Sequence, residues 1–446
     1  MMPKPCTTLR ALWAISLASI VATASAASPD PAAYEVWMID QSDTRGLDHG
    51  GTLYIFAGRD FADGSAPARD AAVTVDLGGA AAALCRERTG ANPVRPHMVL
   101  FNAGFTHAVV AFVASGHVLV LDAATHAPLE CIRTSQSPTG RQAHAAFPAP
   151  DGSYVLVANQ NGKRLERIDS DFAANRFVHN PEATLDLVTC TTPSGRPCQD
   201  PGARPDNAPI CPVISDAGDL AFVTLRGGGM LVVDPRPTPM RIVAEYDMSA
   251  VNGNGCGGMQ VGGRMYVNSG GRPGPMEHLH VYGFDIYRFT LDDFRAPGPL
   301  APNTPTTTTV YQVDGQHDSH GMVLTGSNGS YLWAFDRHAD TVEVLATADD
   351  AHIGTIALNG PLTDNAAPDL SDVSPSGDLV FVALRGPTPL SGDPHNARGT
   401  TPGLGILRVS DGGRSGALIG IVRLSNVGAD GVERADPHGL RVRRLN

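Results

Sequence analysis

The chain has 446 residues, of which 42% are hydrophobic and 17% are charged, with 49 glycines and 35 prolines. Few charged residues and many turn-forming residues argue against long solvated helices and coiled coils, and favour short strands joined by turns. The net charge of −12 at pH 7, without any polybasic block, excludes nucleic acid and anionic lipid as expected partners.

Residues 1–26 are predicted to be a signal peptide, and residues 27–446 to form one domain. Lys4 and Arg10 supply a short basic region, an apolar stretch follows, and Ala24–Ala26 fits a cleavage site made of small residues. The apolar stretch is short for a membrane anchor, and no other stretch is long enough to span a bilayer. We therefore expect a periplasmic or secreted protein with no membrane span after signal removal.

A turn that ends in glycine, followed by an apolar or alternating run, recurs six times along the chain. The anchoring glycines are Gly104, Gly152, Gly218, Gly263, Gly329 and Gly377. Each repeat continues with a polar turn and two more strand-like runs, such as HVLVLDAATH and APLECIRT in the second unit. Four short antiparallel strands in roughly 40–50 residues are typical of a propeller blade. The longer spacings predict loop insertions in the third and fifth units.

The two ends of the chain complete the count of units. YEVWMIDQS, GGTLYIFAGRDF and AAVTVDLGG have the pattern of strands two to four of a unit that lacks its first strand, and the C-terminal DPHGLRVRR has the pattern of an isolated first strand. Joining them gives a seventh blade and leaves no open sheet edge. The predicted fold is therefore all-β, a seven-bladed β-propeller closed by its N- and C-terminal strands and monomeric by default. An eight-stranded barrel with additions is the alternative.

Units that combine a histidine, an apolar strand, an S-P-D/S-G turn and a YVxV run resemble the YVTN-type seven-bladed β-propellers. The resemblance covers about Tyr34 to Asn446, although no YVTN tetrapeptide is present and YVLVANQN and FVTLRGG are the nearest versions. It implies a relationship to the propeller domains of nitrous oxide reductase, thiocyanate dehydrogenase, lactonase-like proteins and the amine dehydrogenase heavy chain. The resemblance is specific for fold and not for function, because propellers host many activities.

The first strand of each propeller blade lines the central channel, so the residues that open these strands converge on the axis. Six of the seven units open with histidine or cysteine, and the remaining unit opens with aspartate. These residues are His97, His144, Cys211, Cys256, His317 with His320, Asp369 with Asp372, and His438. Convergent imidazoles suit copper, zinc or iron. The sequence therefore predicts a metal site formed by His97, His144, His317, His320 and His438.

Two considerations bear on that metal site. The resemblance to nitrous oxide reductase and thiocyanate dehydrogenase, which hold copper clusters in a propeller hub with histidine ligands, favours copper. The structural alternative is that each histidine is a feature of the repeat and forms a hydrogen bond to a neighbouring blade. That alternative requires no metal.

Six cysteines remain after the signal peptide, and an even number in an oxidising compartment favours disulfides. Cys190 and Cys198 bracket the loop TTPSGRP and are predicted to pair. Cys211 and Cys256 hold equivalent positions in adjacent units, so they either form a disulfide or remain free to join the metal ligands. No CxxCH motif occurs, which excludes covalent c-type haem.

The predicted loops between second and third strands open on one face of the propeller and carry polar side chains. The candidate ligand-binding residues are Asn159, Arg226, Arg272, Arg337 and Arg385. Arginines around a channel mouth can bind an anionic or carboxylate-bearing small molecule, so this face is predicted to bind such a ligand or a protein partner. The alternative is salt bridging between blades, to Asp336, Asp340 or Asp369.

The common catalytic signatures GxSxG, HExxH, the P-loop and a helix-opening GxGxxG are absent from the sequence. The first functional hypothesis is a periplasmic metalloenzyme whose hub histidines hold copper or another transition metal for redox chemistry on a small molecule. The second is a non-enzymatic propeller that binds a ligand or partner. The third, a lactonase- or lyase-like enzyme, depends on fold analogy alone.

Overall fold

The computed structural model describes residues 1–2, 33–271, 282–296, 301–391 and 397–445. Apart from its first two residues, the predicted signal peptide lies outside the described residues, and so does Arg272. Within the described part, 28 strands form seven four-stranded antiparallel sheets. The prediction of an all-β, seven-bladed propeller is confirmed.

In every blade, four strands follow one another from the axis outward. Blade 1 contains β28 (Pro437–Arg444), β1 (Tyr34–Asp40), β2 (Thr52–Ala57) and β3 (Val73–Asp76). Blade 2 contains β4 (Pro96–Phe101), β5 (His107–Phe112), β6 (His117–Asp122) and β7 (Pro128–Arg133). Blade 3 contains β8 (Ala143–Pro148), β9 (Tyr154–Asn159), β10 (Arg164–Asp171) and β11 (Arg176–Asp186). Blade 4 contains β12 (Pro209–Ile214), β13 (Ala221–Leu225), β14 (Met230–Asp234) and β15 (Arg241–Tyr246).

The remaining blades follow the same order. Blade 5 contains β16 (Gly258–Val261), β17 (Arg264–Gly271), β18 (Tyr282–Thr290) and β19 (Thr308–Asp314). Blade 6 contains β20 (Ser319–Thr325), β21 (Tyr331–Asp336), β22 (Thr341–Ala346) and β23 (His352–Ala357). Blade 7 contains β24 (Pro368–Val373), β25 (Leu379–Leu384), β26 (Gly403–Ser410) and β27 (Ser415–Arg423). Short 3-10 turns lie at Gly58–Phe61, Arg69–Ala71, Leu291–Phe294, Ser327–Gly329 and Asp411–Gly413.

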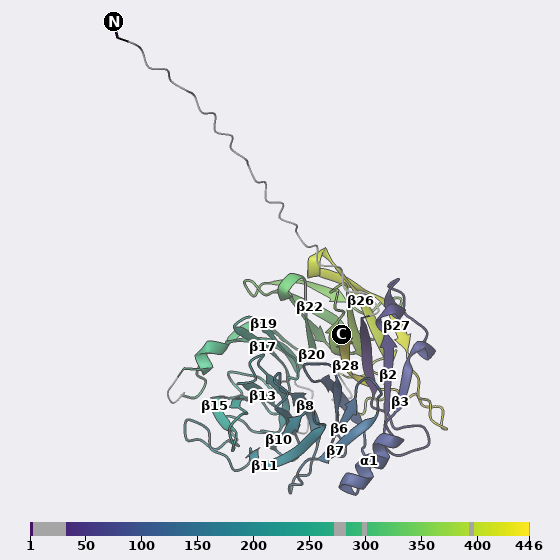
Figure 1. The fold of residues 1–446 in the computed structure, drawn as a ribbon, viewed down its shortest axis with the longest axis horizontal. Coiled ribbons are helices and arrows are strands. Elements are labelled where there is room, and N and C mark those ends of the chain that lie inside the picture. The colour runs from purple at the N-terminus through teal and green to yellow at the C-terminus, as the bar shows by residue number, and fades with distance from the viewer. Residues whose placement is uncertain (3–32, 272–281, 297–300, 392–396, 446) are drawn as a thin grey trace.

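The first strand of each blade lies at the axis and the fourth at the rim. Figure 1 shows β8, β20 and β28 near the middle of the molecule and β3, β15 and β27 at its periphery. Innermost strands contact their neighbours from blade to blade, β20 with β24, β24 with β28, β28 with β4, and β4 with β8. The residues that open these strands are therefore brought together from distant parts of the sequence.

The apolar core fills the spaces between adjacent blades. The second strands are largely buried, and HAVVAF of β5 and LVFVAL of β25 are buried at every residue. Between blades 7 and 1, Phe56, Phe381 and Leu404 belong to one buried cluster. β-branched and aromatic side chains suit such strands because both faces of each sheet pack against a neighbour.

Pairing of the two ends of the chain closes the ring. Strand β28 is antiparallel to β1, with Tyr34 opposite Arg444 and Met38 opposite Leu440. The predicted origin of blade 1 from both termini is confirmed.

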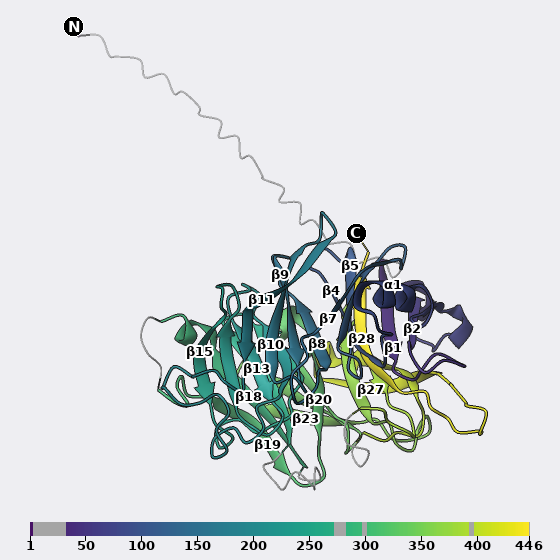
Figure 2. The same cartoon turned by 90° about the horizontal axis from the view of Figure 1, so that it is seen from below.

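One helix was not predicted from the sequence. Helix α1 (Ala80–Thr89) lies in the connection between blades 1 and 2, contacts β7, and is visible beside the outer strands in Figures 1 and 2. Its alanine-rich start favours a helix, and Gly90 ends it with a left-handed φ of 74°. In the described part of the chain, no helix has the length and apolar character needed to cross a membrane.

Removal of residues 436–446 tests the closure of the ring. The deletion removes β28 and exposes the paired edge of β1, and unsatisfied buried backbone groups cost about 1–3 kcal/mol each. Several such losses reach the margin of about 5–15 kcal/mol that keeps a domain folded. We expect the shortened chain to unfold at a much lower temperature in circular dichroism melts. A chain lacking Asn446 alone is the control, and equal melting of all three proteins would contradict the closure.

Candidate metal centre

The residues predicted to converge on the axis lie at irregularities of the innermost strands. Six of the seven innermost strands shift register against the second strand of their blade close to their first residues. The residues inside these shifts include His438, His97, His144, Cys211, His320 and Asp369. A β-bulge adds an unpaired residue and redirects its side chain. The repeated bulge explains why these side chains meet at the axis.

Four imidazoles form a contiguous cluster at the hub. The rings of His97 and His438 are stacked with centroids 3.6 Å apart, and the ring of His144 lies edge-on to His97 at 4.6 Å. The ring of His320 lies edge-on to His438 at 5.4 Å. We call these four residues the hub histidines. His97, His320 and His438 are buried, whereas His144 is partly exposed and gives the cluster its contact with solvent.

Asp369 joins this cluster and is completely buried. Its Oδ1 lies 2.9 Å from Nε2 of His320 and 3.3 Å from Nε2 of His438. Its Oδ2 accepts hydrogen bonds from Nη1 of Arg385 at 2.8 Å and from Nη1 of Arg337 at 3.1 Å. The two guanidiniums therefore fix the carboxylate so that its other oxygen faces the imidazoles.

Hydrogen bonds outside the cluster determine which ring nitrogens carry protons. Nδ1 of His438 donates to the carbonyl oxygen of His97 at 3.0 Å, and Nδ1 of His144 donates to the carbonyl oxygen of Ile210 at 3.0 Å. A carbonyl oxygen can only accept, so both rings are protonated at Nδ1. In a neutral ring Nε2 then carries a lone pair. The predicted alternative, in which a histidine forms a hydrogen bond to a neighbouring blade, is thus present at Nδ1 of His144 and His438. These bonds leave Nε2 of both rings available.

The same logic applies to His97. The side-chain nitrogen of Gln41 donates to Oδ2 of Asp436 at 3.0 Å, so Oε1 of Gln41 accepts from Nδ1 of His97 at 2.8 Å. Among the described residues, Nε2 of His97 has no hydrogen-bond partner although it is buried. Fixing Nδ1 through a polar residue that does not itself bind the metal is how proteins orient metal-binding histidines.

The pKa values of His97, His144 and His438 agree with neutral imidazoles. Burial lowers the pKa of His144 to about 3, and burial together with the neighbouring imidazoles lowers the pKa of His97 well below its usual range. Burial likewise lowers the pKa of His438. Although burial opposes ionisation of Asp369, the neighbouring imidazoles and guanidiniums hold its pKa well below the usual value. At neutral pH the cluster therefore combines the carboxylate of Asp369 with uncharged imidazoles at His97, His144 and His438.

Ligand atoms of His320, Asp369 and His438 all lie within 4.8 Å of one another, which fits a metal site. Two ligands that are each about 2.0–2.2 Å from a metal lie roughly 3 Å apart at octahedral or tetrahedral angles. The observed separations of 2.9 and 3.3 Å match that requirement. Oδ1 of Asp369 contacts Nε2 of His320 and of His438, and beyond these contacts neither Oδ1 nor the ring nitrogens of His320 have a hydrogen-bond partner within the described part of the chain.

Glycines after two of the histidines allow the blades to approach closely. A Cβ atom at Gly439 would lie 2.5 Å from the carbonyl oxygen of His97, and one at Gly321 would lie 2.3 Å from that of Asp369. Backbone atoms cannot yield to such contacts as a flexible side chain would. The HG pairs at 320–321 and 438–439 thus combine a ligand with the space needed to place it.

His317 does not join the hub histidines. Its Nδ1 lies 2.6 Å from Oδ2 of Asp336, which raises the pKa of His317. None of the ring contacts that link the hub histidines includes it. Of the five predicted ligands, the structure brings His97, His144, His320 and His438 together and places His317 beside Asp336, and metal binding by these residues stays a prediction.

Three disulfides stabilise the propeller. Cys190 pairs with Cys198, as the sequence predicts, and Cys85 of α1 pairs with Cys131 of β7. Of the two alternatives for Cys211 and Cys256, the structure has the disulfide, which links blades 4 and 5 at the axis. In this state the two sulfurs are not thiolates.

The predicted ligand-binding residues are engaged within the chain. Arg385 pairs with Asp369 and Asp436, and Arg337 pairs with Asp318 and Asp369, so both follow the salt-bridge alternative to Asp369. Both arginines are buried.

The other two described ligand candidates are Arg226 and Asn159. Arg226 is partly exposed and pairs with Asp206 at 2.5 Å. Asn159 is buried, where its amide donates to Glu166 and accepts from the backbone of Gln142 and Gly162. Ligand binding by Arg226 and Asn159 stays a prediction.

Three supporting residues were not predicted as part of the site. Gln41 orients His97, while Asp318 and Asp436 hold the two arginines. A signal for the aspartates is present, because Asp318 and Asp436 both lie two residues before a histidine–glycine pair, in DSHG and DPHG. No local pattern marks Gln41, whose partners are 56 and 395 residues away.

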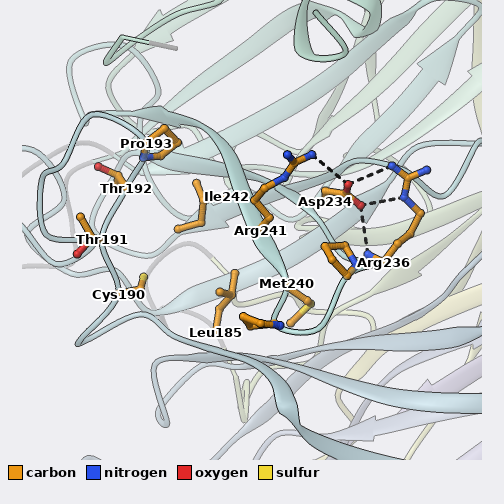
Figure 3. Close-up of a pocket in the computed structure, with 12 residues that line it drawn as sticks. Leu185, Cys190, Thr191, Thr192, Pro193, Asp234, Arg236, Met240, Arg241 and Ile242 are labelled. Carbon is orange, nitrogen blue, oxygen red and sulfur yellow. Dashed lines mark hydrogen bonds and ion pairs between the residues drawn. The ribbon is translucent and has the colours of Figure 1, made fainter. Parts of the chain in front are cut away.

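A cavity of about 860 Å³ lies away from the axis, between the end of β11, the 190–193 segment and the connection from β14 to β15. Figure 3 shows Asp234 on one side of it, paired with Arg236 and Arg241. The cavity contains none of the hub histidines.

The comparisons with known proteins bear on the fold. No family model matches the chain, and no curated protein matches its sequence. The structure is similar to a hypothetical selenium-binding protein from Sulfolobus tokodaii, with 10% identity, a TM-score of 0.57, and coverage of 93% of this chain and 97% of that one. It is also similar to a periplasmic gluconolactonase from Pseudomonas aeruginosa, with 13% identity, a TM-score of 0.53, and coverage of 92% and 100%.

A third similar structure is a provisionally assigned 6-phosphogluconolactonase from Bacteroides fragilis, with 13% identity, a TM-score of 0.55, and coverage of 93% of this chain and 99% of that one. At these identities the likeness establishes the propeller fold alone. The relationship to YVTN-type propellers and to nitrous oxide reductase stays a prediction.

The lowered pKa values of His97, His144 and His438 predict that the metal-free protein is sensitive to acid. Below pH 6.5 these histidines take up protons in the unfolded chain but stay neutral in the folded hub. Their contribution to the free energy of unfolding is therefore fully present above pH 6.5 and is lost as the pH falls toward 3, the folded pKa of His144. Each such histidine contributes about 2 kcal/mol to the loss between pH 7 and pH 5. We expect His144→Gln to reduce that loss in urea unfolding measured at both pH values. Equal losses in variant and parent would contradict the assignment.

Proposed function

We propose that the hub is a transition-metal centre in which His320, His438 and Asp369 are ligands and His97 is a fourth. The observation that carries the proposal is a set of buried polar atoms with no hydrogen-bond partner outside the hub, namely Nε2 of His97, Nε2 of His320 and Oδ1 of Asp369, of which the last two lie 2.9 Å apart. Buried polar atoms in proteins are nearly always satisfied. The ligand atoms of His320, Asp369 and His438 lie within 4.8 Å of one another, and the ring of His97 stacks on that of His438, which supports a bound cation at the hub.

Copper is the metal we propose. Imidazole nitrogen suits copper, zinc and iron, and copper binds most tightly among the divalent first-row metals at a given nitrogen and oxygen site. When bound, copper supplies one-electron redox chemistry to a small molecule. The chain orients the ligands through Gln41, Arg337 and Arg385, and it buries every residue of the hub except the partly exposed His144.

The proposal includes export to the periplasm or the cell exterior. Three disulfides are typical of an oxidising compartment. The amino-terminal sequence has the pattern of a signal peptide. Both observations support a protein that meets its metal outside the cytoplasm.

Elemental analysis of protein purified without a histidine tag tests the metal centre. We expect about one metal ion per chain, lost on treatment with a strong chelator and regained on adding copper. His320→Gln and His438→Gln should each lower metal affinity at least tenfold, because each removes one ligand. These variants are preferable to Asp369→Asn, which also leaves two buried arginines without their shared partner and so costs stability.

Gln41→Ala separates orientation from ligation. Loss of a residue that orients a ligating histidine typically weakens metal binding by about 10–100-fold. His107→Gln, on the second strand of blade 2, is the matched control and should bind metal like the parent. Protein that contains no metal and does not respond to added metal would contradict the proposal and leave the ligand- or partner-binding propeller.

Lactone hydrolysis is a second candidate function. Two of the similar structures are named as lactonases, and the match covers nearly the whole length of each of them. This similarity motivates an assay of lactone hydrolysis. A panel of sugar lactones should be tested with the metal-loaded protein, the chelated protein and His320→Gln. Hydrolysis that requires the hub would favour this function over redox chemistry, whereas no hydrolysis of any lactone would remove it.

A further inference from the structure

We propose that reduction of the Cys211–Cys256 disulfide creates a second metal site at the hub, made of His144 and the two cysteine thiolates and selective for Cu(I). This site is distinct from the ligands of the proposed copper centre. It lies beside that centre, because the ring of His144 contacts the ring of His97.

The three residues are already arranged as a ligand set. One ligand atom from each of His144, Cys211 and Cys256 lies within 4.8 Å of the other two. Because Nδ1 of His144 donates to the carbonyl oxygen of Ile210, the ligating nitrogen is Nε2. His144 and Cys211 open the innermost strands of blades 3 and 4, and Cys256 precedes that of blade 5. Little backbone movement is therefore needed to bring three ligands around one cation.

The oxidation state of the sulfurs decides whether this site exists. In the disulfide the sulfurs carry no charge and are weak donors, whereas thiolates bind metals and soft thiolates select Cu(I). A small dithiol supplies the two electrons and two protons of the reduction. The sulfur–sulfur bond breaks, two cysteine thiols form, and the dithiol becomes a cyclic disulfide. Each thiol then releases its proton when it coordinates Cu(I).

The three residues of this site differ in exposure. Cys211 and Cys256 are buried, but His144 is the partly exposed member of the hub histidines. Because both sulfurs are buried, the reductant used in the test is a small dithiol. Such a hub would hold one metal under oxidising conditions and accept another when reduced.

Titration with Cu(I) under anaerobic conditions tests the proposal. Protein is compared before and after reduction with excess dithiothreitol, followed by desalting, and bound Cu(I) is counted against a coloured Cu(I) chelator. We expect reduced protein to bind at least one more Cu(I) than oxidised protein, with new ultraviolet absorption from sulfur-to-copper charge transfer. The double variant Cys211→Ser/Cys256→Ser should bind one Cu(I) fewer than the reduced parent.

Two further variants identify the site among the other cysteines. His144→Gln, which keeps all six cysteines, should weaken binding of that Cu(I) at least tenfold, and His107→Gln should not. The pair Cys190→Ser/Cys198→Ser should keep the Cu(I) that depends on His144. Equal Cu(I) binding by the reduced parent and Cys211→Ser/Cys256→Ser, or by the reduced parent and His144→Gln, would overturn the proposal.

If the double serine variant does not fold, as judged by circular dichroism, the comparison of His144→Gln with His107→Gln decides the question. The result is independent of the proposed copper centre, whose occupancy is counted on oxidised protein with Cu(II). If oxidised protein binds no Cu(II), the difference in Cu(I) binding between reduced and oxidised protein is still expected. A failed Cu(I) site leaves the Cu(II) count unchanged.

Discussion

The antiparallel ladder between β28 and β1 is the interaction on which the hub depends. It closes the ring of blades, and it also carries His438 from the C-terminal end of the chain to a position beside His97 and Asp369. Asp436, two residues before that histidine, fixes both Arg385 and Gln41. Closure and assembly of the site are thus the same structural event.

The hub is stabilised by a chain of buried charges that alternates in sign. Arg337 lies between Asp318 and Asp369, and Arg385 lies between Asp369 and Asp436. Burying charges is costly, and the cost is offset only when each charge is paired and hydrogen-bonded. Asp369 is the shared member, so its environment determines both the geometry of the arginines and the position of the oxygen that faces the imidazoles.

In contrast to these fully hydrogen-bonded arginines, Nε2 of His97 has no hydrogen-bond partner among the described residues. Leaving a buried polar atom unsatisfied costs about 1–3 kcal/mol, and proteins accept such a cost mainly at functional sites. The bulges that open six of the innermost strands produce this arrangement, because they turn one side chain per blade out of the sheet and toward the axis. Each of these bulged strands therefore contributes its own side chain to the hub, while the backbone arrangement is the same from blade to blade.

The sequence by itself determined the number of blades, their strand order and the closure by both termini, because turn glycines and period-two apolar runs are local signals. It also identified the residues that open each inner strand, since their positions repeat with the blades. The helix between blades 1 and 2 was missed, because ten residues in a connection have no counterpart in the repeat.

Only the tertiary structure decided which of those opening residues act together. His317 and His320 are three residues apart, yet one pairs with Asp336 at its blade while the other meets Asp369 from the next blade. Likewise, Arg337 and Arg385 were candidates for binding an anion, but each forms an ion pair with an aspartate from another blade. Local patterns specify which side chains reach the axis. Contacts across hundreds of residues specify their partners, because those partners are set by how seven blades close around one axis.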